Sequence, residues 1–211
     1  MSLLIILIGV LAFQTQDPRR WNVEGPDSGE EYFFPSLART ASGDFIPTRV
    51  LQNEEYCKEC HEDSFDTWEA SVHRLSSFNN PVYLASVRDT RQVAFERDGN
   101  LQAARFCAGC HDPVVFFGGK FDDPDFDDVH DPTADAGITC TSCHAITHVN
   151  SPRGNSDFTI EEPIHYPFAF SDNPALKWIN RQLVKAKPEF HKKTFLKPLH
   201  KKTEFCGTCH K

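Results

Sequence analysis

The residues with the clearest chemical meaning are eight cysteines, which all fall in Cys-x-x-Cys pairs followed directly by histidine. In c-type haem attachment, two thiols three positions apart bond to one haem, and the adjacent histidine becomes an axial ligand of the iron. The sequence therefore predicts four covalently attached haem c groups. In chain order, motifs one to four are Cys57, Cys60 and His61; Cys107, Cys110 and His111; Cys140, Cys143 and His144; and Cys206, Cys209 and His210.

Two other uses of Cys-x-x-Cys pairs agree less well with this pattern. Zinc ribbons place about 15 to 20 residues between paired half-sites, whereas the motifs here begin 50, 33 and 66 residues apart. Zinc also does not require a histidine after every pair, and with 10 histidines in 211 residues this has a chance of roughly 5 in a million. Thioredoxin-like pairs lie in βαβ units, and none of the four does.

The second axial ligand of each iron must come from elsewhere in the chain. Met1 is the only methionine, so the His/Met ligation that raises haem potential is excluded and low-potential bis-histidine haems are expected. Six histidines lie outside the motifs: His73, His130, His148, His165, His191 and His200.

Chain geometry restricts two of these histidines. His148 lies four residues after His144, a span of at most about 14 Å, so it cannot loop round to the far face of the same haem and should bind a neighbouring one. Apolar residues at helical spacing predict a helix over Ser64 to Leu75. That helix would carry His73 about 18 Å from His61, so His73 should also serve another haem.

The remaining histidines differ in context. His165 lies in an extended, proline-bounded stretch that presents its side chain clearly, and we predict it to be an iron ligand. We also predict His200 as a ligand, although both His200 and His191 could equally be solvated. His130 is expected to be an exposed surface residue because its loop is acidic. The distal ligand of motif two stays open.

Composition excludes some functions and indicates the fold class. The chain has a formal charge of −8 and a pI near 5.6, which opposes binding to nucleic acid. With 39% hydrophobic residues, the haem plates should form much of the core. We therefore expect a mainly α fold with extensive irregular coil and little sheet.

The chain divides into three predicted parts. Leu3 to Phe13 is an apolar run too short to span a bilayer, so residues 1–20 are predicted to be a signal peptide or a membrane anchor, with a buried N-terminal segment as the alternative. Either export route places the protein in the periplasm or on the outer face of the cytoplasmic membrane. Residues 21–56 should form an irregular strap. Residues 57–211 should form a tetrahaem domain, truncated or supported by a partner at its C-terminal end.

Capping residues predict the main helices. Asn80 and Pro81 should open a helix that runs to about Arg97 and closes at Gly99, and Asn173 and Pro174 should open another over Ala175 to Lys185. A short helix is expected over Leu101 to Phe106. Between them, Asp122 to Asp135 holds seven aspartates, and Lys185 to Lys202 holds seven lysines. Each charged segment is either solvated or a docking face, and the acidic one could also bind calcium weakly.

Three segments resemble the multihaem cytochromes c related to the tetrahaem cytochrome that accepts electrons from hydroxylamine oxidoreductase. They are Trp68-Glu69-Ala70-Ser71-Val72-His73, Gly137-Ile138-Thr139-Cys140-Thr141-Ser142-Cys143-His144 with His148 close behind, and Phe205-Cys206-Gly207-Thr208-Cys209-His210. The resemblance covers about residues 55 to 211 and implies that His73 and His148 are distal ligands. The sequence differs from the family pattern in two places. The chain ends one residue after the last motif, and the spacing around motif two does not match.

These features favour a protein that transfers electrons between redox partner proteins through closely spaced, mostly bis-histidine haems. The first alternative is an oxidoreductase that acts on a small nitrogen or sulfur compound at one five-coordinate haem. Motif two is the place for it, with Tyr83, Lys120 and His130 as polar neighbours. The second alternative is a haem subunit of a larger electron-transfer assembly, with membrane attachment or a longer chain.

Overall fold

The computed structural model describes residues 33–210. The segment predicted to be a signal peptide or anchor lies outside the described residues, as does the first part of the strap. Within the described residues, no helix is long and apolar enough to cross a membrane.

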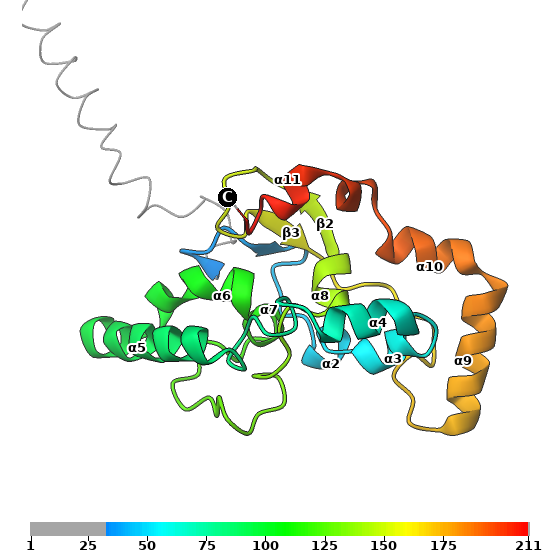
Figure 1. The fold of residues 1–211 in the computed structure, drawn as a ribbon, viewed down its shortest axis with the longest axis horizontal. Helices are drawn as coiled ribbons and strands as arrows, with labels where there is room; N and C mark the ends of the chain where they lie inside the picture. The colour runs from blue at the N-terminus through cyan, green and yellow to red at the C-terminus, as the bar shows by residue number, and fades with distance from the viewer. Residues whose placement is uncertain (1–32, 211) are drawn as a thin grey trace, which may run out of the picture.

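The described chain is mainly α-helical with little sheet, as expected (Figure 1). Three short strands, β1 (Arg39–Thr40), β2 (Ile146–Val149) and β3 (Phe158–Ile160), form a sheet in the order β1-β3-β2, in which β1 is parallel and β2 antiparallel to β3. The helices are α2 (Thr48–Leu51), α3 (Glu54–Lys58), α4 (Glu62–Glu69), α5 (Pro81–Asp98), α6 (Arg105–His111), α7 (Pro113–Phe117), α8 (Cys140–His144), α9 (Pro174–Ala186), α10 (Pro188–Phe195) and α11 (Thr203–Cys206), with 3-10 turns η3 (Gln102–Ala104) and η4 (Pro198–Lys201).

The two long helices begin at the predicted capping residues, and α5 also ends at the predicted Gly99. The Asn80 side chain accepts hydrogen bonds from the backbone N–H groups of the first turn of α5, and the helix ends at Gly99 with a φ of 71°. Asn173 caps α9 in the same way. Proline follows each asparagine, where its missing N–H costs nothing and its fixed φ suits the helix.

The predicted helix over residues 64–75 was wrong in its second half. Helix α4 ends at Glu69, and His73 lies in the turns that follow. The segment after α4 is held by tertiary contacts: the Trp68 indole N–H donates to the carbonyl of Ile138 (2.7 Å), and the Ile138 N–H donates to the carbonyl of His73 (2.9 Å). The helix expected over residues 101–106 is a 3-10 turn followed by α6, which continues through motif two.

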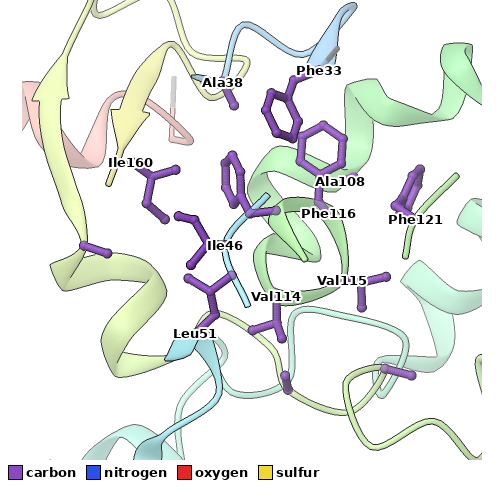
Figure 2. Close-up of a cluster of buried hydrophobic side chains, with 14 of the residues drawn as sticks. Phe33, Ala38, Ile46, Leu51, Ala108, Val114, Val115, Phe116, Phe121 and Ile160 are labelled. Carbon is purple, nitrogen blue, oxygen red and sulfur yellow. The ribbon is translucent and has the colours of Figure 1, made fainter. Parts of the chain in front are cut away.

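A compact apolar core lies between the sheet and the helices around motif two (Figure 2). Every residue of α7 is buried, and its Phe116 ring meets Phe33 edge-on with centroids 5.0 Å apart. Ile46, Leu51 and Ile160 complete the same cluster. This core holds α6, α7 and α8 against the sheet. It therefore fixes the position of motif two, which lies on α6, and of motif three, which lies on α8.

Gly137 permits the close approach of the His73 segment to motif three. Its φ is +66°, and a Cβ at this position would lie 2.3 Å from the carbonyl oxygen of Arg74 and 2.7 Å from that of His73. Gly99 has a similar φ of +71° but open space around the corresponding Cβ position. Replacing Gly99 with alanine would therefore test backbone strain alone, whereas replacing Gly137 would add a collision with neighbouring backbone atoms.

We expect Gly137→Ala to lower the free energy of unfolding by at least about 2 kcal/mol, because it combines left-handed strain with overpacking. Gly99→Ala should cost only about 1 kcal/mol, because it adds the conformational penalty alone. Denaturant unfolding of both holo-variants measures the difference. Equal losses would show that the close approach at Gly137 is unimportant.

Candidate functional site

The motifs place two thiols and a histidine on one side of a single helical turn. In motifs one and four, the histidine N–H donates to the carbonyl of the first cysteine, at 2.9 Å in His61 to Cys57 and 2.8 Å in His210 to Cys206. Positions i, i+3 and i+4 share one face of such a turn. The backbone thus presents all three side chains of each of these motifs in one direction, as attachment to a single haem requires.

Motif three begins at a helix cap. The Thr139 side chain accepts the N–H of Ser142, the Ser142 hydroxyl accepts the N–H of Thr139, and Thr139 Oγ1 donates to the carbonyl of Leu51 (2.6 Å). This reciprocal arrangement satisfies donors that the first turn of a helix leaves free. It fixes α8 at Cys140 against α2 and the apolar core.

Cysteines of different motifs are neighbours. The interaction between the thiols of Cys57 and Cys140 is the main cause that raises the pKa of Cys57 and lowers that of Cys140. Cys110 and Cys209 interact in the same way, which lowers the pKa of Cys110 to about 6 and raises that of Cys209. Cys57 and Cys140 line one cavity. Ser156 contacts Cys110 Sγ (3.0 Å) and donates its N–H to the carbonyl of Thr208 in motif four (2.9 Å). Motif one therefore adjoins motif three, and motif two adjoins motif four.

A cavity of about 470 Å³ lies between motifs one and three and helices α9 and α10. Its lining includes Cys57, Cys60 and His61 of motif one, Cys140 and His144 of motif three, and His191 of α10. The rings of His61 and His191 are 6.1 Å apart between centroids and nearly parallel, at 14°. Metal–nitrogen bonds of about 2 Å on both sides of one ion place two axial imidazole centres roughly 6 Å apart. The cavity and this histidine pair fit a haem.

Two further histidine pairs join a motif to a distal segment. His73 and His210 have ring centroids 5.9 Å apart, again the separation of two axial ligands. His144 and His200 are closer, at 4.8 Å, so their rings must separate by more than about 1 Å to hold an ion between them.

Hydrogen bonds and burial decide which ring nitrogens are available to iron. His144 Nδ1 donates to the carbonyl of Phe195 (2.6 Å), which leaves Nε2 as the ligand atom. His200 Nε2 is buried without a hydrogen-bond partner among the described residues. Its Nδ1 accepts the Lys197 N–H (3.2 Å), and this bond must break for a neutral His200 to bind through Nε2.

Motif two has a different environment. His111 Nδ1 donates to the carbonyl of Ser76 (2.9 Å), which again directs Nε2 toward iron. The Tyr83 ring stacks on His111 with centroids 4.3 Å apart. Among the described residues, no other histidine ring contacts His111.

Tyr83 is held by a buried carboxyl group. Its hydroxyl donates to Asp112 Oδ2, while Asp112 Oδ1 has no hydrogen-bond partner among the described residues. Burial raises the pKa of Asp112 to about 8 and also raises that of Tyr83. A buried pair of this kind fixes the tyrosine ring beside the motif histidine.

The other candidate histidines lie apart from the motif histidines. The His165 ring contacts Phe170 and Phe195, and its Nε2 is buried without a partner among the described residues. His148 is exposed on β2, and no ring contact within the described chain joins it to a motif histidine. The assignments of His148 and His165 as ligands stay predictions.

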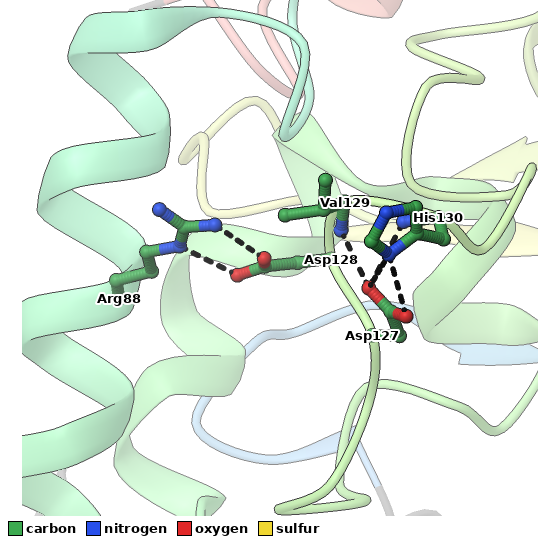
Figure 3. A network of polar contacts seen from close by, with 5 residues as sticks. All are labelled: Arg88, Asp127, Asp128, Val129 and His130. Carbon is green, nitrogen blue, oxygen red and sulfur yellow. Dashed lines mark hydrogen bonds and ion pairs between the residues drawn. The ribbon is translucent and has the colours of Figure 1, made fainter.

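His130 lies in the acidic loop, exposed as expected (Figure 3). Its Nδ1 lies 2.9 Å from Asp127, and backbone N–H groups at positions 130 and 129 lower the pKa of that carboxyl. Asp128 pairs instead with Arg88 of α5 (2.5 Å). Among the described residues, no three His, Cys, Asp or Glu side chains converge to hold a bare metal ion.

Sequence reasoning left His191 undecided and missed the buried role of Asp112. Nothing local to His191 distinguishes it from a solvated residue between lysines, because its approach to His61 depends on the packing of α10. Asp112 had a weak signal, because it directly precedes the apolar run Pro113 to Phe117, and the burial of that run brings the carboxyl group into the core.

Comparison with known proteins agrees with this chemistry. Residues 56–145 match the family described as cytochrome c554 and c-prime, a span that holds motifs one to three. The match covers less than half of the chain. No curated protein and no solved structure matches. The match supports a c-type cytochrome, a class that binds haem c covalently and serves in electron transfer.

A buried carboxyl group near motif one gives the site a pH dependence. Glu54 begins α3, and burial raises its pKa to about 7 against the smaller opposing effect of Arg74. Its Oε1 has no hydrogen-bond partner among the described residues. Since the folded-state pKa lies above the ordinary value of 4.5, the stability that the protonated form contributes is complete below pH 4.5 and is lost as the pH rises through 7.

We expect Glu54→Gln to be more stable than the wild type at pH 8, by roughly 1 to 3 kcal/mol, with the difference vanishing near pH 4.5. Thermal unfolding of the holo-protein across this range measures it. Glu55→Gln, one residue away and exposed, is the control. An unchanged pH slope in Glu54→Gln would contradict the buried-carboxyl account.

Proposed function

We propose that the protein is a tetrahaem c-type cytochrome that transfers electrons between redox partner proteins. The observation that carries this is the adjacency of the attachment motifs. Motif one adjoins motif three at the cavity that Cys57, Cys60 and Cys140 line, and motif two adjoins motif four through Ser156, which contacts Cys110 Sγ (3.0 Å) and donates its N–H to the carbonyl of Thr208 (2.9 Å). Electrostatic interaction between Cys143 and Cys206 joins the two pairs. The motifs thus follow one another in space as one, three, four, two.

Each motif would hold its haem with its own cysteines and histidine, and motifs one, three and four would each add one further histidine. His191 would serve motif one and His73 motif four. His200 would serve motif three, with His165 as the alternative. When bound, haem iron takes up and releases single electrons. The chain's part is to fix each imidazole through carbonyl acceptors such as those of Ser76 and Phe195, and to cover the sites with apolar side chains.

The sequence supports two finer proposals, on the protein's relatives and on its location in the cell. The segments around His73, motif three and motif four support kinship with the tetrahaem cytochrome that accepts electrons from hydroxylamine oxidoreductase. Covalent haem attachment and the apolar N-terminal run support export, to the periplasm or the outer face of the membrane.

A second function is favoured by motif two alone. His111 has Tyr83 against its ring and no histidine partner among the described residues, so its haem would keep one axial position for a small nitrogen or sulfur compound. In the third possibility, the chain works as a haem subunit of a larger assembly. A holo-protein that is a stable monomer in size-exclusion chromatography would contradict the assembly.

The haem count tests the tetrahaem assignment. Intact-mass measurement of the holo-protein, with pyridine haemochrome absorbance, should give four covalently bound haems, because each motif supplies two thiols. The double variant Cys206→Ser/Cys209→Ser should lose one haem and keep three. A wild-type protein with fewer than four haems would contradict the proposal.

The pairing of His61 with His191 has a spectroscopic consequence. We expect His191→Ala to convert one low-spin ferric haem to a high-spin or water-ligated form, since the variant removes one axial nitrogen. His130→Ala, which alters an exposed histidine, should leave the low-temperature electron paramagnetic resonance spectrum unchanged. Equal spectra of wild type and His191→Ala would assign His191 to the surface.

A further inference from the structure

Positive charge is concentrated in one segment of an otherwise acidic protein. Residues 174–202, which span α9, α10 and η4, hold nine Lys or Arg residues and one Glu, whereas the whole chain has a formal charge of −8. Figure 1 shows α9 and α10 at one end of the long axis and α5 at the other. The acidic loop is tied to α5 by the Arg88–Asp128 pair. The molecule therefore has a basic end and an acidic end.

Most of this positive charge is available to a partner. Among the described residues, six exposed lysines of the segment have no carboxylate within ion-pair distance. Only Arg181, with Glu59 at 3.1 Å, and Lys192, with Glu189 at 3.7 Å, are paired. The six lysines are Lys177, Lys185, Lys187, Lys193, Lys201 and Lys202.

Large apolar side chains are exposed on the same helices. Trp178 is 57% exposed, and Ile179, Leu183 and Phe190 are each more than a third exposed. The inner side of α9 is fixed by Asn180, which is buried and donates to the Tyr56 hydroxyl (2.9 Å). Aromatic and aliphatic side chains surrounded by charge are the usual composition of a protein docking surface.

These helices also form the outer wall of the cavity at motif one. Arg181 and Val184 of α9 and His191, Lys192 and Phe195 of α10 line that cavity. A molecule bound to the outer face of α9 and α10 is thus separated from the motif-one site by one layer of helix.

We propose that the outer face of α9 and α10 is the docking surface for an acidic one-electron redox protein, which exchanges electrons at motif one. This inference rests on the proposed electron-transfer function. Charge complementarity selects the partner: the field of the basic segment attracts and orients a negatively charged surface and speeds encounter by 10-fold or more at low ionic strength. The exposed side chain of Trp178 then supplies short-range apolar contact.

The probe is reduced plant-type [2Fe–2S] ferredoxin, a small acidic protein whose potential lies near −400 mV. One electron leaves its cluster and reduces one ferric haem, and stopped-flow absorbance follows the rate. In the triple variant Lys185→Gln/Lys187→Gln/Lys193→Gln, we expect the second-order rate constant at low ionic strength to fall about 10-fold. The Kd for oxidised ferredoxin should rise to a similar degree.

The control is Ala85→Glu/Gln92→Glu/Val93→Glu, which makes the same change in net charge at exposed positions of α5. It should keep the wild-type rate constant within about twofold, because the charges lie at the far end of the molecule and are screened there. Equal losses in both triple variants, or no loss in either, would overturn the proposal.

Two further readouts separate the possible failures. Binding to phosphatidylserine-containing vesicles that is lost in the lysine variant, with ferredoxin kinetics unchanged, would make this face a membrane-binding surface and overturn the protein-docking proposal. Wild-type protein that contains haem but is not reduced by ferredoxin or dithionite would instead contradict the electron-transfer function. Full reduction of both variants by dithionite confirms that their haem sites are intact.

Discussion

The structure depends on bringing four Cys-x-x-Cys-His turns together so that different motifs adjoin. Each turn is local, but the neighbours are distant in sequence: Cys57 and Cys140 line the same cavity, and Ser156 connects Cys110 of motif two to Thr208 of motif four. The apolar core around α7 makes this possible, because it fixes α6 and α8 against the sheet while motifs one and four approach from either end of the described chain. The main role of the core and the sheet is thus to hold the four motifs next to one another.

The histidines opposite the motifs show how irregular chain serves this arrangement. His73 follows a short helix and is held by backbone contacts to Ile138, and His191 lies on α10 behind the motif-one cavity. His111 and His144 each donate through Nδ1 to a backbone carbonyl, which leaves Nε2 of each ring as the atom that would bind iron. Motif two differs because Tyr83 and Asp112 occupy its surroundings.

The sequence was sufficient for the mainly helical fold class and for the helices that begin at Asn80 and Asn173, since capping acts over a few residues. The sequence also indicated covalent haem attachment, because the residues that this chemistry requires lie together in each Cys-x-x-Cys-His motif. It was insufficient for His191, whose distance to His61 depends on the packing of α10, and for the end of α4, where tertiary hydrogen bonds from Trp68 and Ile138 replace helical ones. Periodicity cannot register such long-range bonds.

The central claim of the proposal is that, among residues 33–210, motifs one, three and four each have a histidine partner and motif two has none. Low-temperature electron paramagnetic resonance of the fully oxidised holo-protein tests it most directly, because it counts low-spin and high-spin ferric haems. The account predicts three low-spin haems and one high-spin haem. Four low-spin haems, or more than one high-spin haem, would contradict it.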